Sequence, residues 1–228
     1  MTPDSSNVPR GEATRAALIK AAIDIFGRDG FDAASTRAIA EAAGTNQALI
    51  GYHFGGKPGL YLAVLQDIVD RVGQRIGPLV SAIGTEFCPE PGAGSKPSAK
   101  RAEALLHQLV DAVLGMLTSD ESAAWARLIL REQQDPSEGF DLLYEGIMQR
   151  VLFVMTRLIG CIRGAPADSA ATRLTAFTLI GQTLVFRVAR ATILRQMNWS
   201  ELGAEEVAAI RAQLQRNVTA ILMEQTGL

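Results

Sequence analysis

The stretch GYHFGGKP, residues 51–58, places a lysine where it could bind a phosphate group. Gly51, Gly56 and Lys57 have the spacing of a nucleotide-binding phosphate loop, in which backbone N–H groups and the lysine hold the phosphates. That loop requires a serine or threonine after the lysine as a magnesium ligand, and Pro58 stands there instead. It should also follow a buried strand, whereas the preceding NQALI has a helical pattern. A DNA phosphate is therefore the better partner for this lysine.

The residues before Lys57 have the side chains that DNA recognition needs. Lys57 begins a predicted helix, whose free N–H groups and positive dipole end attract an anion. Tyr52 and His53 can donate hydrogen bonds to phosphate oxygens, contacts that fix the register of a protein on the duplex. Asn46 and Gln47 carry amides, which can pair with adenine in the major groove. We predict base reading at the front of this segment and phosphate contacts at its end.

Neighbouring residues allow further contacts, and some of them also have a structural interpretation. Ala48 and Leu49 can meet a thymine methyl group, and Arg37 can reach a guanine edge or a phosphate. Alternatively, Asn46 only caps a helix, Tyr52 and Phe54 belong to the core, and Arg37 is solvated. Both interpretations stay open at this stage.

The elements that must position these residues are short helices. The first is predicted over Thr14–Phe26 and is expected to end at GRDG, residues 27–30. The second covers about 35–44, with Ser35 or Thr36 as its cap and a glycine at its end, and the third covers about 45–54. Two short helices joined by a few residues that include a glycine are typical of a helix-turn-helix. A fourth helix is predicted from Lys57 to about residue 80.

The remainder of the chain is also predicted to be helical. Residues 84–98 are rich in proline and glycine and are expected to form a linker or a long loop. Helical periodicity follows, with one long helix from 135 to about 163, another over about 170–197 and the last over about 205–224. Strand-like alternation is nowhere sustained, so the expected fold class is all-α.

Composition limits the possible functions. The net charge of −2 excludes a globally basic nucleic-acid coat but allows a local DNA-binding face. The longest apolar run, residues 174–186, is shorter than the roughly 18–20 residues of a membrane-spanning helix. Cys88 and Cys161 lack metal-ligand spacing, and no nucleophile–base constellation emerges. We expect a soluble, cytoplasmic protein without metal, cofactor, membrane partner or enzymatic activity.

The block AAIDIFGRDGFDAASTRAIAEAAGTNQALIGYHFGGKPGLY resembles the N-terminal domain of the TetR/AcrR family of bacterial transcriptional regulators. The segments REQQDPSEGFDLLYEGI, TRLIG and LIGQTLVFRVARATILRQMNW are similar to the subgroup with the CecR-type C-terminal domain. The resemblance implies that homodimers bind palindromic operators in double-stranded DNA and leave them when a small molecule enters the C-terminal domain. Many members of the family carry a tyrosine or another large residue where Gly51 stands. Either base reading at this position is lost, or the backbone approaches the groove more closely.

The residues and the resemblance together predict the organisation of the chain. A flexible tail over 1–12 precedes a helix-turn-helix DNA-binding domain over 13–60, which a helix extends to about residue 80. Residues 81–228 form a larger helical domain for effector binding and dimerisation. The predicted DNA-binding residues are Thr36, Arg37, Thr45, Asn46, Gln47, Ala48, Leu49, Gly51, Tyr52, His53 and Lys57.

Two further sets of residues are predicted in the C-terminal part. Aromatic and methionine residues on the middle helices are candidates for an effector pocket, although such residues also form ordinary cores. They are Met116, Trp125, Phe140, Tyr144, Met148 and Met155. The last two long helices are implied by the resemblance to form a four-helix dimer interface; the helix over 170–197 could instead be a buried central helix. The predicted interface residues are Phe177, Ile180, Leu184, Val185, Val188, Ile210, Leu214, Val218 and Ile221.

The expected function is that of a DNA-binding repressor that an effector releases. Two alternatives share the scaffold: an activator or dual regulator, and a helical dimerisation protein whose DNA reading has decayed. Gly51 motivates the second alternative, because glycine weakens a helix interior by roughly 0.5–1 kcal/mol relative to alanine.

Overall fold

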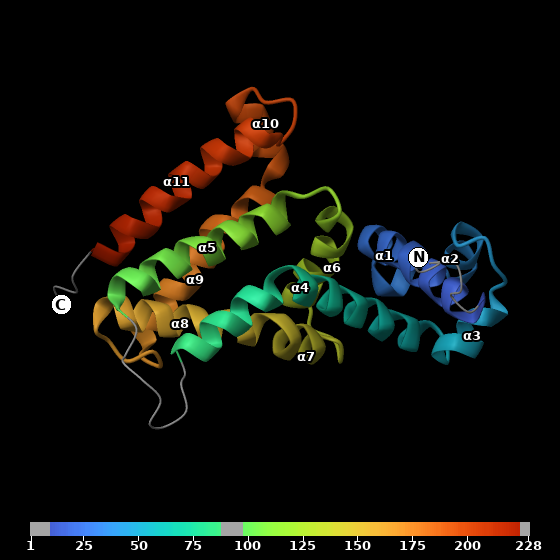
Figure 1. Cartoon of the computed structure of the whole chain (residues 1–228). Coiled ribbons are helices and arrows are strands. Elements are labelled where there is room, and N and C mark those ends of the chain that lie inside the picture. The colour runs from blue at the N-terminus through green and yellow to red at the C-terminus, as the bar shows by residue number, and fades with distance from the viewer. Residues whose placement is uncertain (1–9, 88–97, 224–228) are drawn as a thin grey trace, which may run out of the picture. The chain divides into compact units, whose positions relative to one another are not determined.

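The computed structural model describes residues 10–87 and 98–223, and all its regular elements are helices (Figure 1). The all-α prediction is confirmed. The elements in chain order are α1 (Arg10–Ala33), α2 (Thr36–Ala42), α3 (Ala48–Phe54), α4 (Lys57–Phe87), α5 (Ala99–Thr118), α6 (Ser122–Gln134), α7 (Phe140–Leu143), the π-helix η1 (Tyr144–Met148), α8 (Gln149–Arg163), α9 (Ala170–Val188), α10 (Arg190–Met197) and α11 (Ala204–Met223).

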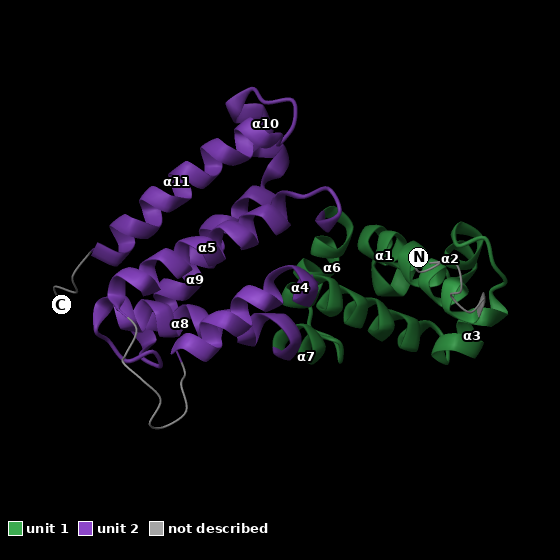
Figure 2. Cartoon of the chain, viewed as in Figure 1, with its two compact units in different colours: residues 1–71, 123–144 green, residues 72–122, 145–228 purple. Residues whose placement is uncertain are grey.

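The chain divides into two compact units, which Figure 2 colours separately. Unit 1 consists of Met1–Arg71 and Ala123–Tyr144, and unit 2 consists of Val72–Ser122 and Glu145–Leu228. The sequence led us to expect two consecutive domains, whereas unit 1 takes in nearly all of α6 and the whole of α7. The apolar periodicity of a helix does not show which distant helices it packs against. The sequence pattern therefore could not predict that α6 and α7 belong to unit 1.

Unit 1 is built around an aromatic cluster from α1 and α4. The side chain of Phe26 is fully buried, and the Tyr61 ring meets the rings of Phe26 and Phe31 edge-on, with both centroid distances 5.1 Å. Ile39 of α2 and Ile50 of α3 are also buried. Helices as short as α2 and α3 are unstable in isolation, so the burial of these two residues is what holds them in place.

Unit 2 is centred on α5, which packs against α8, α9 and α11. Two arginines connect these helices through backbone carbonyls. The Arg163 guanidinium donates to Thr175 Oγ1 at 2.9 Å and to the carbonyl of Ile221. Arg187 of α9 donates to the carbonyls of Leu117 and Ser119. The last carbonyls of a helix have no partner within the helix and carry its negative dipole end, so an arginine stabilises the end of α5.

The interruption of the first helix predicted at GRDG occurs at its last residue, Gly30, where two helical segments meet at a kink within α1. Gly27 remains helical, and α1 continues to Ala33 with non-helical dihedrals inside it at Gly30 (φ 82°, ψ 174°). A Cβ on Gly27 would lie 2.9 Å from the carbonyl oxygen of Ala124 in α6. Gly27 therefore allows α1 and α6 to approach closely, and Gly30 is the residue that interrupts the helix.

Three other predicted boundaries also differ. The loop expected over 84–98 begins later, because α4 continues to Phe87; the rest of that prediction, including Cys88, lies outside the described residues. The helix expected from 135 begins at Phe140, because the N–H and hydroxyl of Ser137 donate to the Glu132 carboxylate and residues 135–139 are not helical. This helix also contains the π-helical turn η1. The helix expected over 170–197 is bent by 75° between α9 and α10.

Candidate nucleic-acid interface

The two short helices of unit 1 are defined by polar caps and one left-handed glycine. Ser35 Oγ accepts a hydrogen bond from the Ala38 N–H at the start of α2, as the sequence suggested. Gly44 has φ 63° after the end of α2, a conformation that favours glycine. The chain then turns within a few residues and begins α3 at Ala48. This is the predicted helix-turn-helix, with α3 starting slightly later than expected.

Asn46 has a structural role at the start of α3. Its Oδ1 accepts a hydrogen bond from the Ala48 N–H at 2.8 Å, which satisfies one of the free donors of the helix. The side chain is exposed together with Gln47 and Ala48, while Leu49 is half-buried. Thr45 is half-buried, and the structure shows no side-chain cap from it. Of the two residues considered as caps, Asn46 is the one that binds the helix.

Gln47 is held in a defined orientation by the preceding helix. Its Nε2 donates to Thr36 Oγ1 at 2.9 Å, and this hydrogen bond is exposed. An amide nitrogen carries two hydrogens, so Gln47 keeps one N–H and its Oε1 for another partner. These two groups are the donor and the acceptor that a bidentate contact with adenine requires.

The exposed face of α3 continues through Gly51 and Tyr52. The Tyr52 side chain is 82% exposed, and its ring lies 5.0 Å from the half-buried ring of His53. A Cβ on Gly51 would meet nothing within 4 Å, so this face of α3 leaves room at that position. Phe54 is half-buried beneath the guanidinium of Arg15, whose Cζ lies 5.3 Å from the ring centroid. The tyrosine is therefore a surface residue and not part of the core.

Lys57 is the first residue of α4, as predicted, but its ammonium already has partners. Nζ donates to the Asp32 carbonyl at 2.9 Å and lies 4.8 Å from the centroid of the Phe31 ring. The side chain is half-buried and attached to the end of α1. An ammonium has three hydrogens, so donors remain for a phosphate oxygen.

Arg37 and the rest of the predicted DNA-facing set lie on the same short helices. The Arg37 guanidinium forms an exposed ion pair with Glu41 at 2.8 Å, one turn along α2. An exposed pair of this kind contributes little to stability, so Arg37 can exchange Glu41 for a phosphate at low cost. All the predicted DNA-contacting residues except Lys57 lie on α2, on α3 or in the turn between them.

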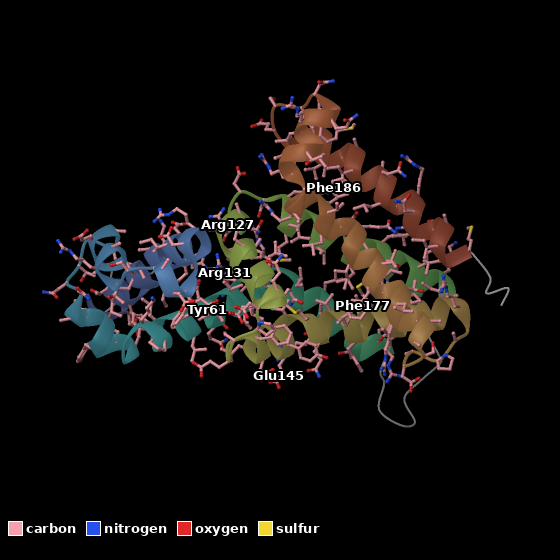
Figure 3. All side chains as sticks on the ribbon, turned by 180° about the vertical axis from the view of Figure 1, so that it is seen from behind. Tyr61, Arg127, Arg131, Glu145, Phe177 and Phe186 are labelled. Carbon is pink, nitrogen blue, oxygen red and sulfur yellow. The ribbon has the colours of Figure 1, made fainter. Side chains whose placement is uncertain are left out.

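A buried polar group on α6, absent from the predicted set, also belongs to this unit. Glu132 is 2% exposed, and its carboxylate accepts a hydrogen bond of 2.6 Å from the Tyr61 hydroxyl. Burial, followed by the bond to Glu132, raises the pKa of Tyr61 above its ordinary value, so the phenol stays protonated and donates. Arg127 donates to the Gly27 carbonyl at 3.2 Å. Figure 3 shows Arg127, Arg131 and Tyr61 where α6 meets α1 and α4. The only sequence signal was the presence of charged residues within an apolar helix.

The predicted effector residues are divided between the units. Trp125, Phe140 and Tyr144 belong to unit 1; Met116, Met148 and Met155 belong to unit 2. Met116, Trp125 and Met155 are buried, while Tyr144 is exposed and stacks on Phe140 at a centroid distance of 6.0 Å. The Trp125 Nε1 is buried and has no acceptor among the described residues.

The predicted dimer residues fall into two groups. On α9, Phe177, Leu184, Val185 and Val188 are exposed large hydrophobic residues, and Ile180 is half-buried. On α11, the side chains of Ile210, Leu214 and Val218 are buried within their own protomer, and Ile221 is half-buried. In one protomer it is therefore α9 that presents a free apolar face.

Neither a metal-binding cluster nor a single membrane-spanning helix occurs among the described residues. No group of three or more His, Cys, Asp or Glu side chains among them is arranged to hold a metal ion. Within the same residues, no single helix is long and apolar enough to cross a membrane, although the bent pair of α9 and α10 together meets the length and hydropathy of a span.

Comparison with known proteins places these features in a family. The family model for bacterial regulatory proteins of the tetR family matches residues 18–64, and the model for the C-terminal domain of the HTH-type transcriptional dual regulator CecR matches residues 102–224. The dual regulator CecR of Shigella flexneri is 32% identical over 213 residues, which cover 93% of each chain. The regulatory protein RaaS of Mycobacterium tuberculosis is 56% identical over 57 residues, covering 25% of this chain and 26% of RaaS.

Solved structures show the same fold at low identity. A TetR-like regulator from Rhodococcus sp. RHA1 has a TM-score of 0.60 and 20% identity, with 96% of this chain and 100% of that chain covered. FadR from Bacillus subtilis, in complex with stearoyl-CoA, has a TM-score of 0.55 and 14% identity, with 93% and 98% covered. The resemblance inferred from the motifs is confirmed.

We expect Gly51→Ala to stabilise the protein, because the new methyl group meets nothing within 4 Å. Alanine in a helix interior is favoured over glycine by roughly 0.5–1 kcal/mol, and the unfolding free energy in a urea titration should rise by that amount. Gly44→Ala is the matched control: its site is equally open, but φ is 63°, so the unfolding free energy should fall. An unchanged or lower free energy for Gly51→Ala would contradict the regular helical geometry of α3.

Proposed function

Because the chain belongs to the TetR family of transcriptional regulators and carries a CecR-type C-terminal domain, we propose that it binds a palindromic DNA operator as a homodimer and leaves it when a small-molecule effector binds. It is a regulator and not an enzyme. The observation that carries the proposal is the exposed face of α3, where Gln47 is held by Thr36 with a donor and an acceptor still free.

In this proposal α3 enters the major groove and α2 supports it. Gln47 reads one base, and Ala48 and Leu49 meet a neighbouring thymine methyl group. Asn46 stays on the backbone of α3 as a cap, so its contribution to base reading is indirect. Tyr52, being exposed at the end of the helix, approaches the sugar-phosphate backbone. Gly51 lets the backbone of α3 come closer to the groove than a large side chain would.

Phosphate contacts come from cations beside α3. Lys57 stands at the start of α4, where the helix dipole also favours an anion, and Arg37 exchanges Glu41 for a phosphate. With a net charge of −2, the chain depends on this local distribution for DNA affinity.

The dimer forms through the exposed face of α9. Phe177, Val185 and Val188 are 57%, 43% and 54% exposed, and their spacing places them along one side of the helix. A free apolar face of this kind on a folded protomer is a common site of protein association. Two-fold symmetry of the dimer then matches the symmetry of a palindromic operator.

The effector binds beside Trp125. An indole N–H that is buried without an acceptor costs about 1–3 kcal/mol, and a ligand oxygen that accepts from it removes this cost. The effector is therefore a small molecule with an apolar body and a hydrogen-bond acceptor. Because α6 continues into the unit that holds α3, a ligand that prefers one position of α6 can change DNA affinity.

One observation favours a second candidate function. The relative that matches along nearly the whole chain, CecR of Shigella flexneri, is a dual regulator. The present chain would then activate some promoters and repress others. Transcription in vitro from templates with the operator upstream of, or overlapping, the promoter distinguishes the two. A dual regulator raises transcription from the upstream template and lowers it from the overlapping one, whereas a pure repressor raises transcription from neither.

Selection of bound duplexes from a random library tests the central proposal. We expect recovery of an inverted repeat, whose half-site separation reports the dimer. Recovery of no common sequence would favour the alternative in which DNA reading has decayed. Recovery of an asymmetric single site would contradict the dimeric mode.

We expect Gln47→Ala to relax base preference at one position in each half-site. A good bidentate contact is worth about 1–3 kcal/mol of discrimination, so the preferred base should lose roughly that much of its advantage. The measurement is competition binding against the four variants at each position of the selected site. Thr36→Val should relax the same position more weakly, because Gln47 remains but is no longer oriented; an unchanged profile for Gln47→Ala would eliminate its role.

We expect Val185→Arg to separate the dimer, because it places an unpaired charge in the proposed interface. Sedimentation should then show a species near the monomer mass of 24.4 kDa, with operator binding weakened. Gln108→Arg, an exposed position on α5, is the control and should leave the mass unchanged. If the Val185→Arg variant remains dimeric, the dimer interface does not lie on this face of α9.

We expect Trp125→Phe to weaken the response to a compound found by screening for operator release. Loss of one hydrogen bond, about 0.5–1.5 kcal/mol, should raise the releasing concentration roughly two- to tenfold while operator binding is retained. Trp199→Phe, the other tryptophan of the chain, is the control. Equal responses of the two variants would remove Trp125 from the effector site.

A further inference from the structure

Glu132 is the one charged side chain among the described residues that is buried. Its carboxylate accepts from the Tyr61 hydroxyl at 2.6 Å, from the Ser137 N–H at 3.0 Å and from the Ser137 hydroxyl at 2.9 Å. A buried charge is tolerated only when such bonds replace its water, and removal of one partner is costly. The position of Glu132 is therefore tightly determined.

The helix that carries Glu132 is seated closely on α1. Arg127 donates to the Gly27 carbonyl at 3.2 Å, and a Cβ on Gly27 would lie 2.9 Å from the Ala124 carbonyl oxygen. A Cβ on Gly30 would collide with the guanidinium of Arg131. Gly27 and Gly30 thus make room for Arg127 and Arg131, which lie one turn apart on α6. These close contacts restrict sliding of α6 along α1.

On the other side of the bond, Tyr61 adjoins the residues that hold Lys57. Tyr61 lies one turn after Lys57 on α4, and its ring packs against Phe31 at a centroid distance of 5.1 Å. The Lys57 ammonium lies over that same Phe31 ring and binds the Asp32 carbonyl. An uninterrupted series of contacts therefore runs from the Glu132 carboxylate to the Lys57 ammonium.

A cavity of about 230 Å³ separates the two sides of this arrangement. One wall contains Phe31, Asp32, Pro58 and Tyr61, and the other contains Arg131, Glu132 and residues 135–138. Side chains do not fill this space, so the separation of the walls depends in part on the contacts that bridge it. The hydrogen bond between Tyr61 and Glu132 joins them directly.

We propose that Glu132 is a positioning residue for DNA binding: through Tyr61 it fixes the first turn of α4 and the Phe31–Asp32 segment, and thereby places the Lys57 ammonium for a DNA phosphate. This inference rests on the proposed function of Lys57 as a phosphate contact. Glu132 itself does not touch DNA. Loss of its bond to Tyr61 frees the wall that carries Lys57, and the ammonium no longer reaches its phosphate.

The test is the salt dependence of binding to a duplex recovered by the selection. The slope of log K against log salt is negative, and each lost phosphate contact reduces its magnitude by roughly one. A lower slope is one of smaller magnitude. We expect Lys57→Ala, Tyr61→Phe and Glu132→Ala each to lower the slope by roughly one per subunit. Glu132→Gln, which keeps an acceptor for the phenol, should restore a slope close to that of the wild type. Glu145→Gln, at an exposed glutamate, is the control and should change nothing.

Tyr61→Phe keeps the ring and removes one oxygen, so it tests the proposal even where Glu132→Ala fails to fold; circular dichroism and thermal unfolding monitor folding. In the Lys57→Ala background, Tyr61→Phe should lower the slope no further. A wild-type slope in folded Tyr61→Phe, a further decrease in the double variant, or a loss of affinity with no change of slope would each overturn the role of Glu132. A wild-type slope in Lys57→Ala would instead remove the phosphate contact itself and the inference with it.

Discussion

The hydrogen bond between Tyr61 and Glu132 joins two segments that are 71 residues apart in the chain, and the organisation of unit 1 depends on it. A charged carboxylate becomes buried, which is favourable only because a phenol and Ser137 satisfy it. The same contact brings α6 into the unit that carries the DNA-reading helix. The two glycines of GRDG serve this arrangement, because their missing side chains let α6 lie directly on α1. A pattern that interrupts a helix at Gly30 thus also takes part in a helix–helix contact.

Both ends of α6 form hydrogen bonds or ion pairs with polar side chains, in addition to the burial of Trp125 and Leu128. At its start, Arg187 donates to Ser122 Oγ and to the Ser119 carbonyl, and Arg75 binds Glu121 at 3.0 Å. Near its end, Glu132 accepts hydrogen bonds from Tyr61 and Ser137. Hydrogen bonds to carbonyls and carboxylates have directional geometry, so a displaced helix loses them together. Under the proposed function, a ligand that prefers one arrangement of these bonds would shift the equilibrium between DNA-bound and free states.

The residues proposed to contact DNA differ in the interactions that hold their side chains in the free protein. Asn46 is committed to the backbone of α3, Gln47 is oriented by Thr36 with part of its amide free, and Tyr52 is fully available. Lys57 donates to the Asp32 carbonyl, so the proposed phosphate contact would share or replace that partner. Pre-orientation of this kind reduces the entropy lost on binding, whereas a committed side chain contributes to the fold of the reading helix and not to the reading itself.

The sequence by itself determined the helices, the helix-turn-helix and the residues of α3 that face outward, because caps, glycines and apolar spacing act within one or two turns. Ser35, for example, caps the start of α2, as its residue type and position predicted. Only the tertiary structure decided which distant groups meet: that Glu132 pairs with Tyr61, that Gly27 receives α6, and that Ile210, Leu214 and Val218 are buried within their own protomer. The physical reason is that burial of an apolar stripe looks the same in sequence whether the covering surface is the same chain or a partner. The hydrogen bonds of Tyr61 with Glu132 and of Arg127 with Gly27 join residues 71 and 100 positions apart, and no local pattern in the sequence indicates such pairs.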